Sequence, residues 1–114
     1  MSNDHYRKVR YAFRFLNVPL HLAEELRALK PGLELKTAKY KDTENLVVSL
    51  ELTDGCNYDW LPGLIARHSL SPMVYGVWVS LVTESVSDGV RVPEFLIDIL
   101  KKVGGQFDFS FTCV

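Results

Sequence analysis

The sequence has few of the features that directly indicate a function. It contains 2 cysteines among 114 residues, Cys56 and Cys113, and their separation fits neither a CxxC pair nor another metal-binding spacing. Its apolar stretches are broken by charge or proline well before the roughly 20 residues that a membrane-spanning helix needs. The first five residues, MSNDH, lack the basic-then-apolar pattern of a secretion signal. We therefore expect no membrane partner and a cytoplasmic location, where thiols stay reduced.

The sequence also lacks an excess of charge of either sign. Thirteen Lys and Arg residues oppose 14 Asp and Glu residues, which gives a net charge of -1 and does not favour a nucleic-acid partner. A hydrophobic content of 47% is typical of a globular protein. Residues 1–114 are accordingly predicted to form a single domain, with residues 1–5 disordered.

Recognisable catalytic and metal-binding motifs are missing as well. His5, His21 and His68 lie far apart in the sequence and are interpreted as independent residues, with no metal site. GxSxG is absent, and neither cysteine has a histidine within several residues to act as its base. Glycine-rich phosphate loops are absent too. We therefore predict no catalytic residues, no cofactor and no enzyme activity.

What the sequence does contain is a regular alternation of strand and helix patterns. Period-two alternation predicts strands over residues 9–15, 33–40, 46–53 and 106–113, and a run rich in Val, Tyr and Trp predicts a central strand, covered on both faces, over residues 74–82. Apolar residues at helical spacing predict helices over residues 20–29 and 93–103 and a short helix over 60–68. Polar or glycine-containing segments between them predict turns at residues 30–32, 41–45 and 85–89.

The order β-α-β-β-(short α)-β-α-β predicts an α+β fold. We expect an antiparallel or mixed sheet of about five strands, with two helices on one face, in a ferredoxin-like arrangement with one added strand. The first and last strands carry aromatic faces and are expected to pair near the centre of the sheet beneath the helices. Cys113 is interpreted as a small residue that fills the core.

One short segment resembles a nucleic-acid-binding family. Residues 9–19, VRYAFRFLNVP, followed by a helix with a Glu-Glu-Leu run, resemble the first strand and helix of an RNA recognition motif. That family's more diagnostic Lys/Arg-Gly-Phe/Tyr run is not matched by residues 44–51, ENLVVSLE, so base recognition would depend on one strand. RNA binding is therefore an alternative function that we do not favour.

The layout of the chain resembles a second family. The resemblance lies in the opening strand that leads through residues 17–19 into a helix, the Trp60-Leu61 segment, the aromatic strand around Trp78, and the terminal helix-Gly-strand with residues 107–111. These features are similar to those of small bacterial proteins described only as a domain of unknown function, some of which are immunity proteins encoded beside secreted toxins. The resemblance implies a non-catalytic protein that binds and neutralises a cognate toxin.

A toxin-binding surface needs aromatic anchors and a polar rim. Tyr58 and Trp60 are the predicted anchors if they are exposed, and Glu51, Asp54 and Asp59 are predicted to meet a basic nuclease toxin. Trp60 has the alternative role of filling the core beneath its short helix. A further alternative is a small-molecule-sensing domain, which would form a homodimer through its edge strands and bind its ligand at the seam.

Overall fold

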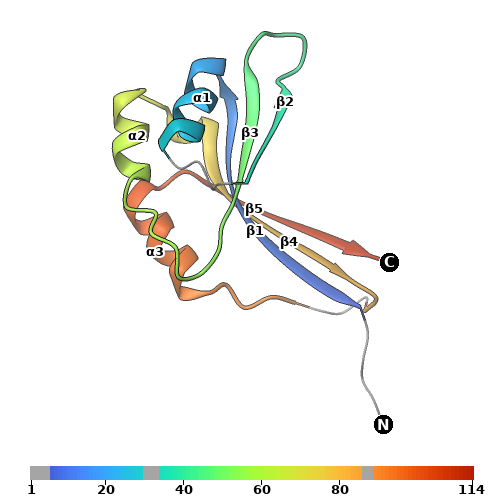
Figure 1. The fold of residues 1–114 in the computed structure, drawn as a ribbon. Coiled ribbons are helices and arrows are strands. Elements are labelled where there is room, and N and C mark those ends of the chain that lie inside the picture. The colour runs from blue at the N-terminus through green and yellow to red at the C-terminus, as the bar shows by residue number, and fades with distance from the viewer. Residues whose placement is uncertain (1–5, 30–33, 86–88) are drawn as a thin grey trace.

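The computed structural model describes residues 6–29, 34–85 and 89–114. Within these ranges the chain forms an α+β fold of three α-helices and one five-stranded mixed sheet (Figure 1). The expected disorder of residues 1–5 and the expected turn at residues 30–32 lie outside the described residues. So does most of the turn expected at residues 85–89.

The elements follow the expected sequence order, with different bounds. They are β1 (Arg7–Val18), α1 (Leu20–Leu29), β2 (Leu35–Lys39), β3 (Leu46–Glu51), α2 (Leu61–Arg67), the 3-10 helix η1 (Pro72–Val74), β4 (Tyr75–Thr83), α3 (Glu94–Val103) and β5 (Gln106–Cys113). The sequence predicted two helices packed on the sheet, and the structure has three in the described ranges. The segment predicted as a short helix forms a regular α-helix, α2, whose Leu61, Leu64 and Ile65 are buried. No helix in the described ranges is long and apolar enough to span a membrane.

The strands are ordered β2-β3-β1-β4-β5 across the sheet. β1 is the central strand and runs antiparallel to both β3 and β4, and β2 runs antiparallel to β3. β4 and β5 are parallel neighbours, which requires a crossover connection, and the segment containing α3 provides it. The prediction that the first and last strands pair is therefore wrong, because β4 lies between them.

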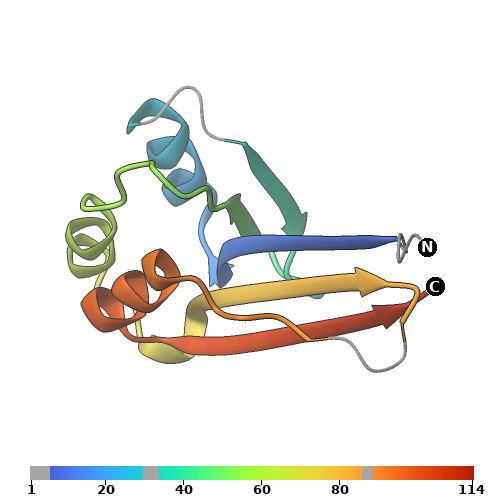
Figure 2. The ribbon, with the colours of Figure 1, turned by 90° about the horizontal axis from the view of Figure 1, so that it is seen from below.

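The core lies between one face of the sheet and the helices. Alternate residues of the two central strands are buried on this face, among them Phe13 and Phe15 of β1 and Val77 and Val79 of β4. The opposite residues of β4, such as Trp78, are only partly buried. The three helices lie together against one side of the sheet (Figure 2). The expectation that the strand at 74–82 is covered on both faces was therefore wrong.

The end of the sheet at which β4 and β5 finish is less covered by helices than the sequence suggested. Figure 2 shows β1, β4 and β5 extending together beyond the helices. Phe107, Phe109 and Phe111 of β5 are 44%, 50% and 41% exposed, and Cys113 is also exposed. The interpretation of Cys113 as a core residue was wrong, because β5 is an edge strand instead of a central one.

Two glycines allow β4 to approach the connection between α3 and β5. A Cβ atom at Gly76 would collide with the backbone of Gln106, and one at Gly105, which has a φ of +92°, would lie 2.7 Å from the ring of Tyr75. The hydroxyl of Tyr75 donates to the carbonyl of Val103 at 2.7 Å. These contacts fix the C-terminal end of α3 against the beginning of β4.

Candidate functional site

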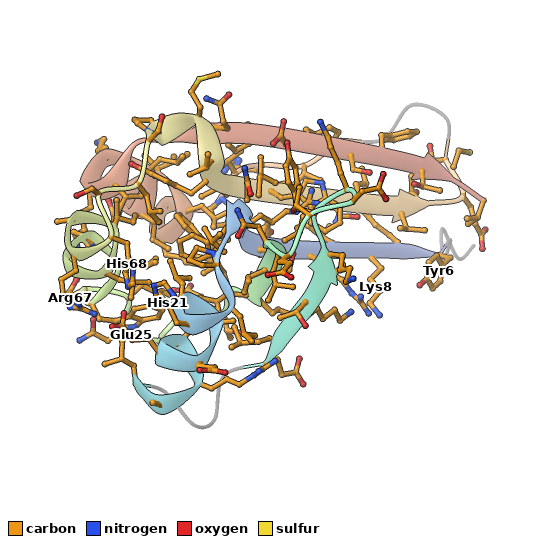
Figure 3. The ribbon with its side chains drawn as sticks, turned by 90° about the horizontal axis from the view of Figure 1, so that it is seen from above. Tyr6, Lys8, His21, Glu25, Arg67 and His68 are labelled. Carbon is orange, nitrogen blue, oxygen red and sulfur yellow. The ribbon has the colours of Figure 1, made fainter. Side chains whose placement is uncertain are left out.

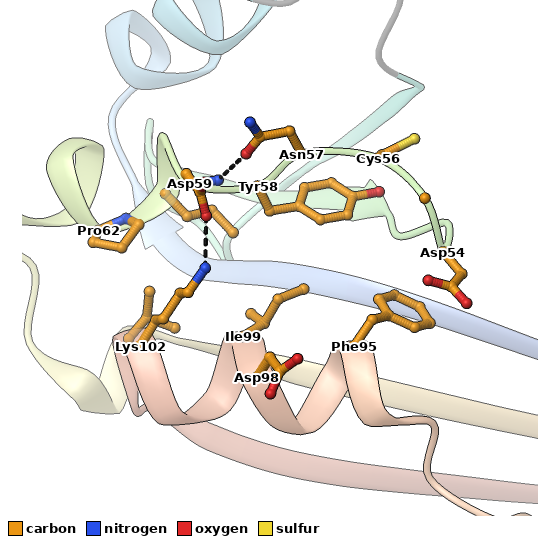
Figure 4. A pocket seen from close by; sticks show the side chains of 13 residues that line it. Asp54, Cys56, Asn57, Tyr58, Asp59, Pro62, Phe95, Asp98, Ile99 and Lys102 are labelled. Carbon is orange, nitrogen blue, oxygen red and sulfur yellow. Dashed lines mark hydrogen bonds and ion pairs between the residues drawn. The ribbon is translucent and has the colours of Figure 1, made fainter.

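A pocket lies between α3 and the loop that joins β3 to α2. Its volume is about 270 Å³ (Figure 4). The loop contributes residues 54–59, α2 contributes Leu61 and Pro62, and α3 contributes Phe95, Asp98, Ile99, Lys102 and Val103.

The loop is held in shape by hydrogen bonds within it. The Thr53 amide donates to the hydroxyl of Tyr58 at 2.7 Å, and that hydroxyl lies 3.2 Å from the Thr53 carbonyl. The side-chain oxygen of Asn57 accepts from the Asp59 amide at 2.7 Å. The ring of Tyr58 belongs to the core, and its burial raises the pKa of the phenol. The loop is therefore anchored from within by a tyrosine.

α3 forms the opposite wall because of its amphipathic sequence. Glu94 in its first turn and Lys101 and Lys102 in its last turn complement the helix dipole. Leu96 and Ile99 are buried, which fixes the rotation of the helix about its axis. Phe95, Asp98 and Lys102 are spaced by three and four residues, so they share one side of the helix and face the pocket.

An ion pair joins the two walls. The ammonium nitrogen of Lys102 lies 2.6 Å from a carboxylate oxygen of Asp59, and both side chains are exposed. The hydrogen bond with Asp59 raises the pKa of Lys102, and the charge of Asp98 contributes in the same direction. The pocket lining contains three carboxylates and one ammonium group. The excess of carboxylates makes a cation the complementary guest.

Three of the five residues predicted to bind a partner meet in this pocket. Asp54 and Asp59 lie toward opposite ends of the loop, and Tyr58 lies between them (Figure 4). Tyr58 is only 8% exposed, so it does not offer the exposed aromatic anchor that the sequence suggested. Trp60 is partly buried, packs against the core, and donates from its indole nitrogen to the Asn57 carbonyl at 3.1 Å.

Glu51 is separated from the other four residues. It is paired with Ala12 on the face of the sheet opposite to the helices, where it lines a shallow hollow of about 70 Å³ with Arg10 and Lys36. The separation follows from strand geometry, because neighbouring residues of a strand point to opposite faces. Leu50 faces the core, so Glu51 faces away from it.

The same open face bears on the alternative of RNA binding. Of the aromatic residues in the segment that carried the resemblance, Phe13 and Phe15 are fully buried against the helices. Tyr11 is partly buried and contacts Phe95 of α3. On the open face the guanidinium of Arg14 lies 5.1 Å from the ring centroid of Trp78. The two phenylalanines are therefore core residues in this fold and do not form a platform for stacked bases.

The residues from α3 were missed by the sequence interpretation. Asp98 and Lys102 stand four residues apart on the polar side of a predicted helix, which is also the pattern of an ordinary solvated surface. Nothing in the sequence connects them with a loop about 40 positions earlier. Only the packing of α3 beside that loop makes them part of one site.

A second polar cluster joins α1 to α2 (Figure 3). One carboxylate oxygen of Glu25 lies 3.0 Å from Arg67 and 2.9 Å from the Nε2 atom of His68. These hydrogen bonds, that of His68 first, lower the pKa of Glu25. His21 is exposed and His68 is partly buried, as expected of surface or boundary histidines, but their rings are 5.6 Å apart and therefore not independent. No group of three or more potential metal ligands occurs among the residues described.

Comparison with known proteins adds no relative. No family model, no curated protein and no solved structure matches this chain. The resemblance of layout to immunity proteins therefore stays a prediction.

Proposed function

We propose that this chain is a non-catalytic protein-binding domain whose pocket between residues 54–59 and α3 receives a basic side chain of a partner protein. The observation that carries the proposal is the lining of the pocket, in which Asp54, Asp59 and Asp98 accompany a single cation, Lys102. A partner guanidinium or ammonium group would find carboxylate acceptors on two sides. The apolar surfaces of Phe95 and Ile99 would pack against the methylene stem of the same side chain.

The ion pair between Lys102 and Asp59 shows that a cation can bind to the carboxylates of this pocket. Lys102 occupies one of the carboxylates in the free protein. A partner arginine offers planar, two-pronged hydrogen bonding that lysine lacks, so it can compete for that carboxylate or bind Asp54 and Asp98. Because both residues of the pair are exposed, its rearrangement on binding costs little.

A bacterial toxin with a basic surface is the partner that we propose, on the basis of the resemblance of layout. Acidic groups around a pocket would speed the encounter with such a surface. We also propose the ferredoxin-like description of the fold, which is supported by the order β2-β3-β1-β4 with α1 and α2 in the connections, β5 being the added strand. Cys56 does not point toward α3 in Figure 4, and no histidine lines the described pocket, which supports a binding role.

The pocket can be tested with a minimal probe. N-acetyl-arginine amide is titrated into ¹⁵N-labelled protein, and N-acetyl-citrulline amide, which has the same shape without the charge, serves as the control. We expect the arginine compound to shift the amide resonances of residues 54–59 and of α3, and Asp98→Asn to weaken the effect. Equal shifts with both compounds, or shifts located elsewhere, would contradict the proposed pocket.

The partner is tested separately from the pocket. If the gene beside this one encodes a toxin, its purified C-terminal domain is expected to bind this chain with a dissociation constant of about 1 nM, and Asp98→Lys is expected to weaken that binding at least tenfold. A neighbouring biosynthetic gene set, or binding that Asp98→Lys leaves unchanged, would argue against a toxin at this pocket.

A further inference from the structure

The sheet has two edges, and they differ in how they are protected. β2 forms one edge with five residues, and the exposed Lys36 and Lys39 on it are the kind of charge that blocks pairing with another chain. β5 forms the other edge with eight residues, of which Asp108 is the only charged one. Within the described ranges no strand pairs with the outer side of β5. This second edge therefore lacks the usual protection.

The hydrogen bonding of β5 shows which residues could bond to an additional strand. The amide of Val114 donates to the carbonyl of Thr83 on β4 at 2.8 Å. Successive residues of a strand direct their backbone N–H and C=O groups to alternate sides of the strand. The backbone groups of the even-numbered residues of β5 therefore point toward β4. The backbone groups of Phe107, Phe109 and Phe111 consequently point outward from the sheet.

The side chains of the same three residues form an exposed apolar row. By register Phe107, Phe109 and Phe111 lie opposite Val77, Val79 and Leu81, which face the core, but the phenylalanines remain about half exposed. Three exposed phenylalanines in a row on an edge strand are uncommon on the surface of a monomer. The exposed phenylalanine side chains and the outward backbone groups belong to the same residues. One additional strand would therefore both cover these side chains and form hydrogen bonds with these backbone groups.

We propose that the strand that pairs with β5 is β5 of a second copy of this chain, antiparallel, with the two-fold axis passing through Phe109. In this register Phe107 faces Phe111 of the other copy, and Phe109 faces Phe109. Each of the three phenylalanines of β5 then lies opposite a phenylalanine of the other copy. Such cross-strand aromatic pairs stabilise a sheet. The two five-stranded sheets become one continuous sheet.

The other face of β5 selects the same register. With the axis through Phe109, each Asp108 faces Ser110 of the other copy. A two-fold axis through position 108 would instead place two aspartates directly opposite each other, which is destabilising. An axis through position 110 would place Phe107 opposite Cys113 and lose a phenylalanine pair. The strand is therefore self-complementary in one register, which favours a second copy over an unrelated peptide.

This proposal does not depend on the proposed function, because β5 contributes no residue to the pocket. It is tested by sedimentation velocity over a series of concentrations. We expect the wild type to change from monomer to dimer as its concentration rises. Phe109→Glu places two carboxylates on the axis and is expected to leave only monomer. Leu20→Glu, at a residue of α1 that is 53% exposed, is the matched control and is expected to dimerise as the wild type does.

Two further variants test the register without touching a phenylalanine. Ser110→Lys would face Asp108 of the other copy twice in each dimer and is expected to tighten association about fivefold, whereas Ser110→Glu is expected to weaken it by a similar factor. A wild type that is monomeric at every concentration, or a Phe109→Glu variant that still dimerises, would overturn the proposed interface. Shifts of the two Ser110 variants in the same direction would overturn the register.

Discussion

The ammonium group of Lys102 lies 2.6 Å from a carboxylate oxygen of Asp59 and joins α3 to the loop that follows β3. The pair joins the two walls of a pocket whose other charged residues, Asp54 and Asp98, are acidic. This one contact therefore both links the two walls of the pocket and reduces its negative charge.

Lys102→Met separates these two effects. Since both partners of the ion pair are exposed, the free energy of unfolding should change little. Removal of the cation makes the pocket more negative, so the affinity for N-acetyl-arginine amide should rise, as measured by NMR titration. Lys101→Met removes an equal charge from a neighbouring exposed residue that does not line the pocket and is the control. An equal change in affinity for both variants would mean that Lys102 has no specific effect on binding in the pocket.

Tyr58→Phe is expected to loosen the loop that forms one wall of the pocket. The variant keeps the buried ring but removes the acceptor of the Thr53 amide. We expect a loss of about 1 kcal/mol in the free energy of unfolding and faster hydrogen exchange at Thr53. Tyr6→Phe alters a tyrosine that is 49% exposed and should have no such effect. Unchanged exchange at Thr53 would contradict the role assigned to the hydroxyl.

Gly76→Ala and Gly63→Ala are expected to change stability in opposite directions. A Cβ atom at position 76 would collide with the backbone of Gln106, whereas one at position 63 would only touch the end of the Arg67 side chain at 3.9 Å. Urea denaturation should show a loss of about 2–3 kcal/mol for Gly76→Ala and a gain of about 0.5 kcal/mol for Gly63→Ala in α2. A neutral Gly76→Ala would mean that β4 and β5 are not this close.

The stabilisation by Glu25 should depend on pH. Hydrogen bonds with His68 and Arg67 lower its pKa in the folded protein below the ordinary value of 4.5. A lowered carboxyl pKa stabilises the fold above the unfolded pKa, and this stabilisation is lost as the pH falls through the folded pKa.

Glu25→Gln should therefore be less stable than the wild type at pH 7 and nearly equal to it at low pH, as measured by thermal unfolding across pH. Glu24→Gln, at the exposed neighbouring position, should show no comparable pH-dependent difference. A difference for Glu25→Gln that grows toward low pH would contradict the direction of the pKa shift.

Local patterns were sufficient to find most elements of the fold. α1 begins and ends where the spacing of Leu22, Leu26 and Leu29 places it, and β5 covers residues 106–113 as predicted. These elements are determined by the periodicity of apolar residues over one segment. The same patterns placed Cys113 in the core, and this placement was wrong. The anchor role of Tyr58 required exposure of its side chain, which is only 8% exposed.

The sequence by itself determined which segments are strands and helices and which side of each is apolar, since these properties depend on neighbours a few positions away. Only the tertiary structure decided that β4 separates β1 from β5, and that Asp98 and Lys102 face Asp54 and Asp59 across a pocket. The physical reason is that pairing between distant segments depends on the packing of the whole core and on close approaches such as that of Gly76 to Gln106. The ion pair of Lys102 with Asp59 is a product of that packing, and no local pattern contains it.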